Sequence, residues 1–339
     1  MLDKRIDLRQ LWQAWPIRGP WRLSSLKGGT NNQLWRAETA NGERYALRVV
    51  PDLTQLERFR SEAALLFALS KADLPFSLPL PVPTHNGEDM AFLEDGGETL
   101  ALATLLPYLS GERPDRNNPL LAQSAGAALA VLDNALAALP EGVVSSGRER
   151  GYSYGNLVLG SDPLVATEQL PVERDKVGQV HHMISSVLQE VASLYGRLPQ
   201  QLLHLDYVPS NILMQDQRVT AVFDFEFAGY DLRIMELAVA LSWWPVRLMG
   251  TGKEWEVMDA FAMSYLAGLP LSEEELSALP SVLRLREVGS LIHRMQRYFA
   301  GLETDVEMQE RVEHSLWREA WLLASRELLL QHTAAWLSS

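Results

Sequence analysis

The chain has 339 residues, 47% of them hydrophobic and 22% charged, which suits about two globular domains with sizeable cores. The absence of cysteine excludes disulfides, thiolate metal sites and a cysteine nucleophile. The net charge is -13; residues 1–107 hold 12 basic and 13 acidic residues, so the excess of acid lies in the second part. That excess argues against a nucleic-acid partner, and it fits either a cationic small-molecule substrate or a purely solubilising role.

The N-terminal segment MLDKRIDLRQLW is charged from its first residues and lacks the apolar stretch of a secretory signal. The chain contains no run of about 18 uncharged apolar residues, so no membrane span is expected. The sequence therefore predicts a cytoplasmic protein with no membrane partner.

The first part of the chain reads as strands with one helix. Residues 21–50 predict strands, and Asn41-Gly42 between two alternating runs predicts a two-residue hairpin turn. Residues 51–70 carry an apolar stripe at helical spacing, after a possible cap at Asp52 or Thr54. Two more strands are expected at 90–94 and 99–109, before a polar linker at 109–119 that contains Gly and Pro.

The second part reads as mainly helical. Apolar spacing predicts helices at 120–139, 176–195 and 306–337, whereas 141–175 is expected to be loop. Within this part, residues 211–214 and 218–223 predict one short hairpin with its turn at 215–217. The order indicates a small β-rich lobe followed by a helical lobe.

Polar side chains gather at the two open ends of that hairpin. His204, Asp206 and Asn211 come before or at its first strand, and Asp224 and Glu226 follow its second strand. The hairpin is expected to bring Asn211 and Asp224 together as oxygen ligands for Mg²⁺, with Asp206 placed to accept a hydroxyl proton during phosphoryl transfer. Each residue alone is equally well explained as a cap, a loop contact or half of an ion pair. Together they favour a site, because buried polar groups rarely accumulate without partners.

The first part carries signals for a nucleotide. Gly28-Gly29 lies in a turn between strands, where backbone amides can approach phosphates. Ala46 and Arg48 share a strand face that suits an adenine ring and a phosphate cation. Glu62 lies close to the apolar stripe of its helix, which favours a pair with Arg48 over a surface pair with Arg58.

These motifs resemble the aminoglycoside phosphotransferase / choline kinase-like family. The resemblance rests on GGTNN, YALR, LLPYLSGE, HLDYVPSNIL, VFDFEFAG and DLRIMELA. It implies an α+β, protein-kinase-like bilobal fold: a nucleotide-binding lobe at 1–107 with a small antiparallel sheet and one helix, a hinge at about 105–111, and a helical catalytic lobe at 108–339. It also implies ATP, Mg²⁺ and transfer to a hydroxyl of a small molecule: an amino alcohol, a homoserine-like compound, a sugar or an aminoglycoside.

The resemblance also implies roles for individual residues. Asp206 is the expected catalytic base, Asn211 and Asp224 the metal ligands, and Glu226 and Asp231 candidate substrate contacts. The expected nucleotide site is formed by Gly28, Gly29, Thr30, Asn31, Ala46, Arg48, Glu62, Pro107, Tyr108 and Leu109.

Three residues depart from the family pattern. Leu205 stands where Gly is usual, Arg48 where Lys is frequent, and Glu236 where Asp is usual. A protein kinase is disfavoured, because Glu226 replaces the Gly that follows Asp-Phe in such enzymes. The alternative to an enzyme is a degenerate nucleotide-binding module that acts through a partner; the presence of Asp206, Asn211 and Asp224 disfavours it.

The remaining candidates are aromatic and histidine residues in the second part. Trp243, Trp244, Tyr298 and Phe299 would suit a substrate cation, but aromatic residues at such positions more often form core. His181, His182 and His293 lack metal-ligand spacing and are expected to be structural.

Overall fold

The computed structural model describes residues 11–17, 19, 21–26, 33–95, 98–140, 142–143, 153–159 and 163–338. The chain divides into two compact units. The first comprises the described residues up to Glu112, a short segment after Leu139 and Thr220–Glu226, and the second comprises the rest. Sequence analysis placed a boundary at 107/108 and did not predict that Thr220–Glu226 belongs with the first unit.

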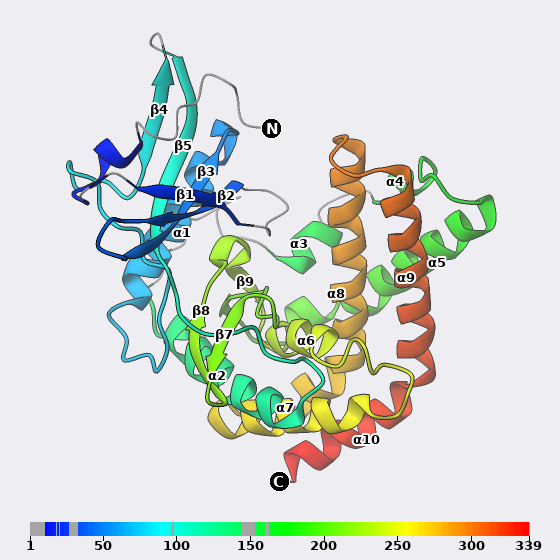
Figure 1. The fold of residues 1–339 in the computed structure, drawn as a ribbon. Coiled ribbons are helices and arrows are strands. Elements are labelled where there is room, and N and C mark those ends of the chain that lie inside the picture. The colour runs from blue at the N-terminus through cyan, green and yellow to red at the C-terminus, as the bar shows by residue number, and fades with distance from the viewer. Residues whose placement is uncertain are drawn as a thin grey trace. The chain divides into compact units, whose positions relative to one another are not determined.

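The first unit is built on one antiparallel sheet with the strand order β1-β2-β3-β5-β4 (Figure 1). Its strands are β1 (Arg22–Ser25), β2 (Gln33–Glu38), β3 (Arg44–Val50), β4 (Ala91–Asp95) and β5 (Glu98–Pro107), and its helix is α1 (Leu56–Leu69). Short 3-10 turns cover Leu11–Ala14 and Leu53–Gln55, and the side chain of Asp52 caps the second turn. The sheet and the single helix agree with the sequence prediction.

The β2–β3 connection corrects one detail of that prediction. The strands are joined by residues 39–43, not by Asn41-Gly42 alone. Thr39 and Glu43 close the loop through a backbone hydrogen bond of 2.9 Å, and Gly42 has a φ of 82°. Glycine is needed there because side chains are strained in the left-handed region.

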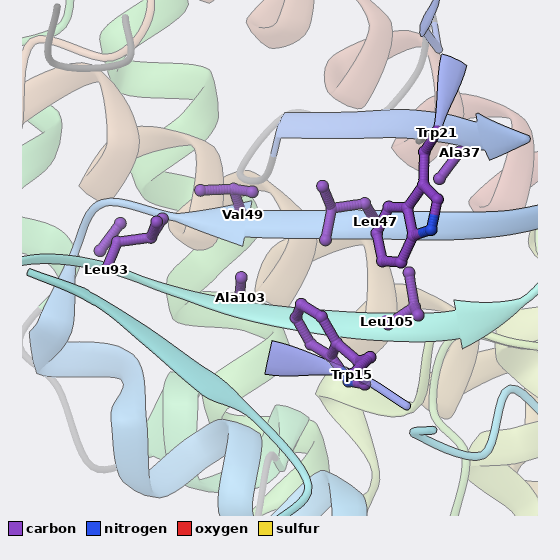
Figure 2. Packing of buried hydrophobic residues seen from close by; sticks show 9 residues of the cluster. Trp15, Trp21, Ala37, Leu47, Val49, Leu93, Ala103 and Leu105 are labelled. Carbon is purple, nitrogen blue, oxygen red and sulfur yellow. The ribbon is translucent and has the colours of Figure 1, made fainter. Parts of the chain in front are cut away.

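The core of the first unit forms where two tryptophans cover one face of the sheet. Trp15 and Trp21 have ring centroids 6.3 Å apart and lie over the small and branched side chains of Ala37, Leu47 and Leu105 (Figure 2). The indole nitrogen of Trp15 donates to the carbonyl of Val82 at 2.9 Å, so its polar atom is satisfied inside the core. This packing fixes β3, the strand that carries Arg48.

The second unit is mainly helical. Its helices are α2 (Pro119–Ala137), α3 (Tyr154–Leu159), α4 (Pro163–Thr167), α5 (Arg174–Val191), α6 (Arg233–Trp243), α7 (Glu254–Gly268), α8 (Glu273–Phe299), α9 (Asp305–Ala324) and α10 (Arg326–Leu337), with a 3-10 turn at Leu194–Gly196. Capping boxes start both α8 and α9, through Ser272 with Glu275 and Thr304 with Glu307. The long helices α8 and α9 pack side by side (Figure 1).

Two short ribbons accompany the helices. Strands β7 (Ile212–Gln215) and β8 (Arg218–Val222) pair as the predicted hairpin, and Asp216 and Gln217 turn it with φ values of 48° and 61°. Such angles at both turn positions match the twist of a tight hairpin. A second ribbon, β6 (Gln200–Leu203) with β9 (Gly229–Leu232), was not predicted.

The helical predictions need two corrections. The stretch 141–175, predicted as loop, contains α3 and α4, which are too short to show a periodic pattern. The single helix predicted at 306–337 is divided at Ser325, which ends α9 and precedes α10.

Helix α2 is long and apolar enough to cross a membrane by length and composition. Half of its most apolar window is buried inside the protein, where α2 packs against α7. Gly126 permits this close approach, because a Cβ there would lie 2.2 Å from the carbonyl oxygen of Phe261. The helix therefore has the character of a core helix of the second unit.

We expect Gly126→Ala to lower the free energy of unfolding by about 1–3 kcal/mol, because the new methyl group forces α2 and α7 apart. The matched control is Gly178→Ala on α5, where a Cβ meets nothing within 4 Å. That variant should gain about 0.5–1 kcal/mol from helix propensity. Urea unfolding measures both, and equal effects of the two substitutions would contradict the packing argument.

Candidate active site

Arg48 and Glu62 form a buried ion pair in the first unit. The two terminal nitrogens of Arg48 lie 3.3 and 2.9 Å from the two carboxylate oxygens of Glu62. The Nε of Arg48 donates to the hydroxyl of Thr104 at 3.3 Å. The guanidinium also lies over the ring of Phe59, with 4.3 Å to the centroid. The predicted pair is therefore present. Its rival is not: Arg58 instead contacts Glu226.

The other described nucleotide candidates lie along β3 and the end of β5. Ala46 pairs with Leu106, and Arg48 with Thr104, so the two candidate residues of β3 occupy one face. Pro107 ends β5, and the N–H of Tyr108 donates to the carbonyl of Arg44 at 3.3 Å. Tyr108 and Leu109 are half-buried. Gly28, Gly29, Thr30 and Asn31 lie outside the described residues.

Asp224 follows β8 in a left-handed conformation, with a φ of 69°. The pKa of its carboxyl is raised to about 7, mainly by burial and also by the neighbouring charges of Glu226 and Glu62, while Arg48 and Arg58 oppose the rise. A buried carboxylate in acidic company is stabilised by a cation. Glu226 is held by Arg58, which lies 3.3 Å from its carboxylate and also donates to its carbonyl at 3.1 Å.

The loop from His204 to Asn211 positions Asp206 in the second unit. The side-chain amide of Asn211 donates to the carboxylate of Asp206 at 2.5 Å and to its carbonyl at 3.1 Å. The N–H of Asp206 donates to Nδ1 of the buried His204 at 3.2 Å. Asp206 itself is only half-buried, so a substrate can reach it. Because the nitrogen of Asn211 faces Asp206, its amide oxygen is the end suited to a cation.

Leu205 and Glu236, two of the departures from the family pattern, meet in this loop. Leu205 has a φ of 60°, in the region that glycine adopts without strain, and its side chain is buried. Its N–H donates to the carboxylate of Glu236 at 2.9 Å. Burial raises the pKa of Glu236 to about 7, and backbone N–H groups of Leu205, His204 and Tyr207 limit the rise. Glu236 thus holds the loop through its backbone.

Asp231 was a candidate substrate contact, but protein donors already occupy both of its oxygens. One accepts hydrogen bonds from Tyr195 and from the N–H of Leu232, each at 2.7 Å. The other accepts from the N–H of Tyr154 at 2.7 Å and from the hydroxyl of Ser153 at 3.2 Å. The residue is fully buried. These contacts argue for an architectural role, so we do not assign Asp231 to the substrate.

The aromatic candidates also have protein partners. Trp243 packs against the guanidinium of Arg286, 5.3 Å from the ring centroid, and Trp244 is buried against Phe261. The hydroxyl of Tyr298 donates to Asp305 at 2.8 Å. His293 lies edge-on to Phe227, with centroids 5.8 Å apart. Among the described residues, no group of three or more His, Asp or Glu side chains forms a metal site by itself.

Sequence analysis overlooked a polar and charged group in the second unit. It consists of Tyr154 on α3, Arg286 and Glu287 on α8, and Arg311 and Arg318 on α9. All are buried except Arg311, which is half-buried. Arg311 and Arg318 are seven residues apart, so they lie on one helical face. That spacing was a usable signal, but it gives no indication that α8 covers the face.

We expect the free energy of unfolding to fall as pH rises from about 5 to 7, because the folded protein retains a proton on Glu236 that the unfolded chain releases near its ordinary pKa of 4.5. Glu236→Gln keeps an acceptor for the loop and removes this titration. In the variant, the fall in the free energy of unfolding between about pH 5 and 7 should be smaller by on the order of 2 kcal/mol. Urea unfolding between pH 5 and 8 measures it, with exposed Glu57→Gln as the control; an unchanged slope in Glu236→Gln would contradict the assignment.

Three comparisons with known proteins agree on the family. The model of the phosphotransferase enzyme family matches residues 22–250, more than half of the chain. A homoserine kinase of Phenylobacterium zucineum (strain HLK1) is 29% identical over 278 residues, covering 81% of this chain and 79% of that protein. A homoserine kinase of Methylocella silvestris (strain DSM 15510 / CIP 108128 / LMG 27833 / NCIMB 13906 / BL2) is 29% identical over 289 residues, covering 82% of each.

Solved structures show the same fold. An amicoumacin kinase in complex with AMP-PNP, Ca²⁺ and Ami has a TM-score of 0.71 at 17% identity, covering 93% of this chain and 94% of that one. A microcompartment-associated aminopropanol kinase gives a TM-score of 0.70 at 20% identity, covering 96% and 97%. The predicted resemblance and the predicted fold are thereby confirmed. The chain belongs to the phosphotransferase enzyme family, and it is a small-molecule kinase with the protein-kinase-like fold.

Proposed function

We propose that this kinase phosphorylates the hydroxyl of a homoserine-like amino acid or a related amino alcohol, with ATP as donor. The observation that carries the proposal is the hydrogen-bonded pair of Asp206 and Asn211 in the loop after β6. The acceptor class is supported by the two homoserine kinases, which match about four fifths of the chain, and by the aminopropanol kinase of similar fold.

Asp206 is suited to act as the base. The side-chain amide of Asn211 donates to its carboxylate and fixes the direction in which the carboxylate points. That carboxylate is proposed to accept the proton of the acceptor hydroxyl. As the hydroxyl oxygen forms its bond to the γ-phosphorus, the bond from that phosphorus to the β-phosphate oxygen breaks and ADP leaves. The loop fixes the carboxylate before the substrate arrives, which is how positioning lowers the barrier.

The residues around the hairpin fit a magnesium ion. We propose that Asn211, before β7, and Asp224, after β8, provide an amide and a carboxylate oxygen, a donor set typical of Mg²⁺ bound together with phosphate oxygens. Burial and acidic neighbours raise the pKa of Asp224, and a cation bound at this carboxylate would oppose both effects. The ion would supply neutralisation of the phosphate charge.

We assign the ATP site to the first unit. Arg48, fixed by Glu62, is proposed to face the phosphates, Ala46 the adenine, and residues 107–109 the edge of the base. The GGTNN turn, with Gly28, Gly29, Thr30 and Asn31, is proposed to cover the phosphates. The hydrogen bonds from Arg48 to Glu62 and Thr104 support this role, because they hold the guanidinium in one orientation.

Asp206→Asn should reduce kcat by about 10²–10⁴-fold while ATP binding is retained, because the amide cannot accept the proton. ATP consumption is measured against homoserine, amino alcohols, sugars and aminoglycosides, and binding is measured by calorimetry. Turnover that survives the substitution would remove Asp206 from the mechanism. Turnover of only sugars or aminoglycosides would overturn the proposed acceptor class, and ATP binding without any turnover would favour the degenerate module.

Glu62→Ala should weaken ATP binding by about 10-fold or more, because Arg48 loses the partner that fixes it. The matched control is Glu57→Ala on the same helix, where an exposed ion pair with Arg60 at 2.8 Å is lost. That pair contributes little to stability, so its loss should leave the dissociation constant of ATP unchanged. Equal loss of thermal stability in both variants with unchanged ATP affinity would count against the role of Arg48.

A further inference from the structure

Three arginines surround one glutamate between α8 and α9. The carboxylate of Glu287 lies 3.1 Å from Arg318, 3.3 Å from Arg286 and 3.7 Å from Arg311, and it accepts a hydrogen bond from Ser315 at 2.7 Å. Arg286, Glu287 and Arg318 are each at most 3% exposed. We call these four charged residues the arginine cluster.

The charges of the arginine cluster do not balance. A neighbouring arginine on the same helix, Arg284, is matched by Glu190 and by Glu319. In the cluster, by contrast, one carboxylate faces three guanidinium groups. Burial lowers the pKa of Arg318 to about 10 and lowers that of Arg311, and the mutual repulsion of the arginines adds to the effect of burial. Such an arrangement is costly unless another anion completes it.

The cluster also carries unused hydrogen-bond donors. Within the part of the chain that the structure describes, the Nε atoms of Arg286 and Arg311 are buried and have no hydrogen-bond partner. Arg318 is anchored to the carbonyl of Ser242 at 2.9 Å, so it is the structural member of the group. Buried donors without acceptors are rare in folded proteins. Here they belong to side chains that bind carboxylates well.

Tyr154 links the cluster to the catalytic loop. Its ring packs on α8, where a Cβ at Gly289 would lie 2.5 Å from Cδ1 of the tyrosine. The tyrosine forms a hydrogen bond with the guanidinium of Arg286. Burial raises the pKa of Tyr154 to about 12; the charge of Arg286 opposes the rise, and the charge of Asp206 adds to it. The N–H of Tyr154 also donates to Asp231 at 2.7 Å, and Asp231 lies on β9, which pairs with β6 directly before the loop of Asp206. Tyr154 thus connects the cluster with the ribbon that leads into the catalytic loop.

We propose that Arg286 and Arg311 bind the carboxylate of the acceptor, so that the enzyme takes a hydroxylated α-amino acid in preference to an amino alcohol. The inference rests on the proposed function and narrows its substrate class. A carboxylate matches the fork of a guanidinium with two parallel hydrogen bonds. It would also supply the missing negative charge of the cluster, whereas a purely cationic acceptor would meet repulsion there.

The test compares homoserine with 3-aminopropan-1-ol, which is homoserine without its carboxylate. Wild-type enzyme should favour homoserine in kcat/KM by about 10–100-fold, as expected for charge-assisted hydrogen bonds. Arg286→Met should remove most of that preference, mainly through KM for homoserine. The matched control is Arg284→Met, a buried arginine of the same helix with balanced charge: it should lower thermal stability but keep the acceptor preference. If Arg286→Met does not fold, Arg311→Met replaces it.

Calorimetric titration with each acceptor separates failure of the inference from failure of the proposed function. If neither compound is phosphorylated but wild type binds homoserine more tightly and Arg286→Met loses that difference, the proposed function falls and the carboxylate site stands. If both compounds are phosphorylated with equal kcat/KM, or if Arg286→Met weakens both to the same extent, the site is overturned and the cluster only joins α8 to α9. Absence of phosphorylation together with absence of binding overturns both.

Discussion

The catalytic loop depends on one buried carboxylate. Glu236 reaches from α6 to the backbone of the loop and accepts the N–H of Leu205. This contact holds Leu205 in a left-handed conformation that a side chain adopts only at a cost. The burial of the leucine side chain offsets part of that cost. The position of Asp206, one residue later, follows from this backbone geometry, and so does its hydrogen bond with Asn211.

The two departures in the loop are best understood together. A longer acid on α6 accompanies a larger residue in the loop, where the related family has Asp and Gly. The glutamate is fully buried, and one of its oxygens has no hydrogen-bond partner among the described residues; the same is true of Asp133 on α2. Burial and, to a smaller extent, the neighbouring Glu236 raise the pKa of Asp133, while a hydrogen bond from Tyr265 opposes the rise. The second unit thus keeps two acids in its interior, one of which holds the loop.

Buried charge has a different character on the two sides of the second unit. Near α2 and α6 the buried groups are the carboxyl groups of Asp133 and Glu236, whose pKa values are raised by burial. Between α8 and α9 the buried groups are mainly arginines. The overall excess of acid in the sequence therefore says little about the acceptor, because the residues that meet a ligand are few and locally chosen. The net charge is compatible with a cationic substrate or with a purely solubilising role, whereas the arginine cluster favours an anionic group on the ligand.

The sequence by itself determined the fold and the reaction chemistry. The spacing of His204, Asp206, Asn211 and Asp224 and the alternation of the first hundred residues are local signals, since hairpins and helices place neighbours in the chain at predictable positions. The pair of Arg48 and Glu62 was also predictable, because a buried acid needs a partner. Only the tertiary structure decided that Asp231 is saturated by protein donors, that Glu236 supports the loop, and that α8 and α9 join their arginines around Glu287. Those contacts link residues from separate elements, and their positions depend on how whole helices pack, which no local pattern in the sequence records.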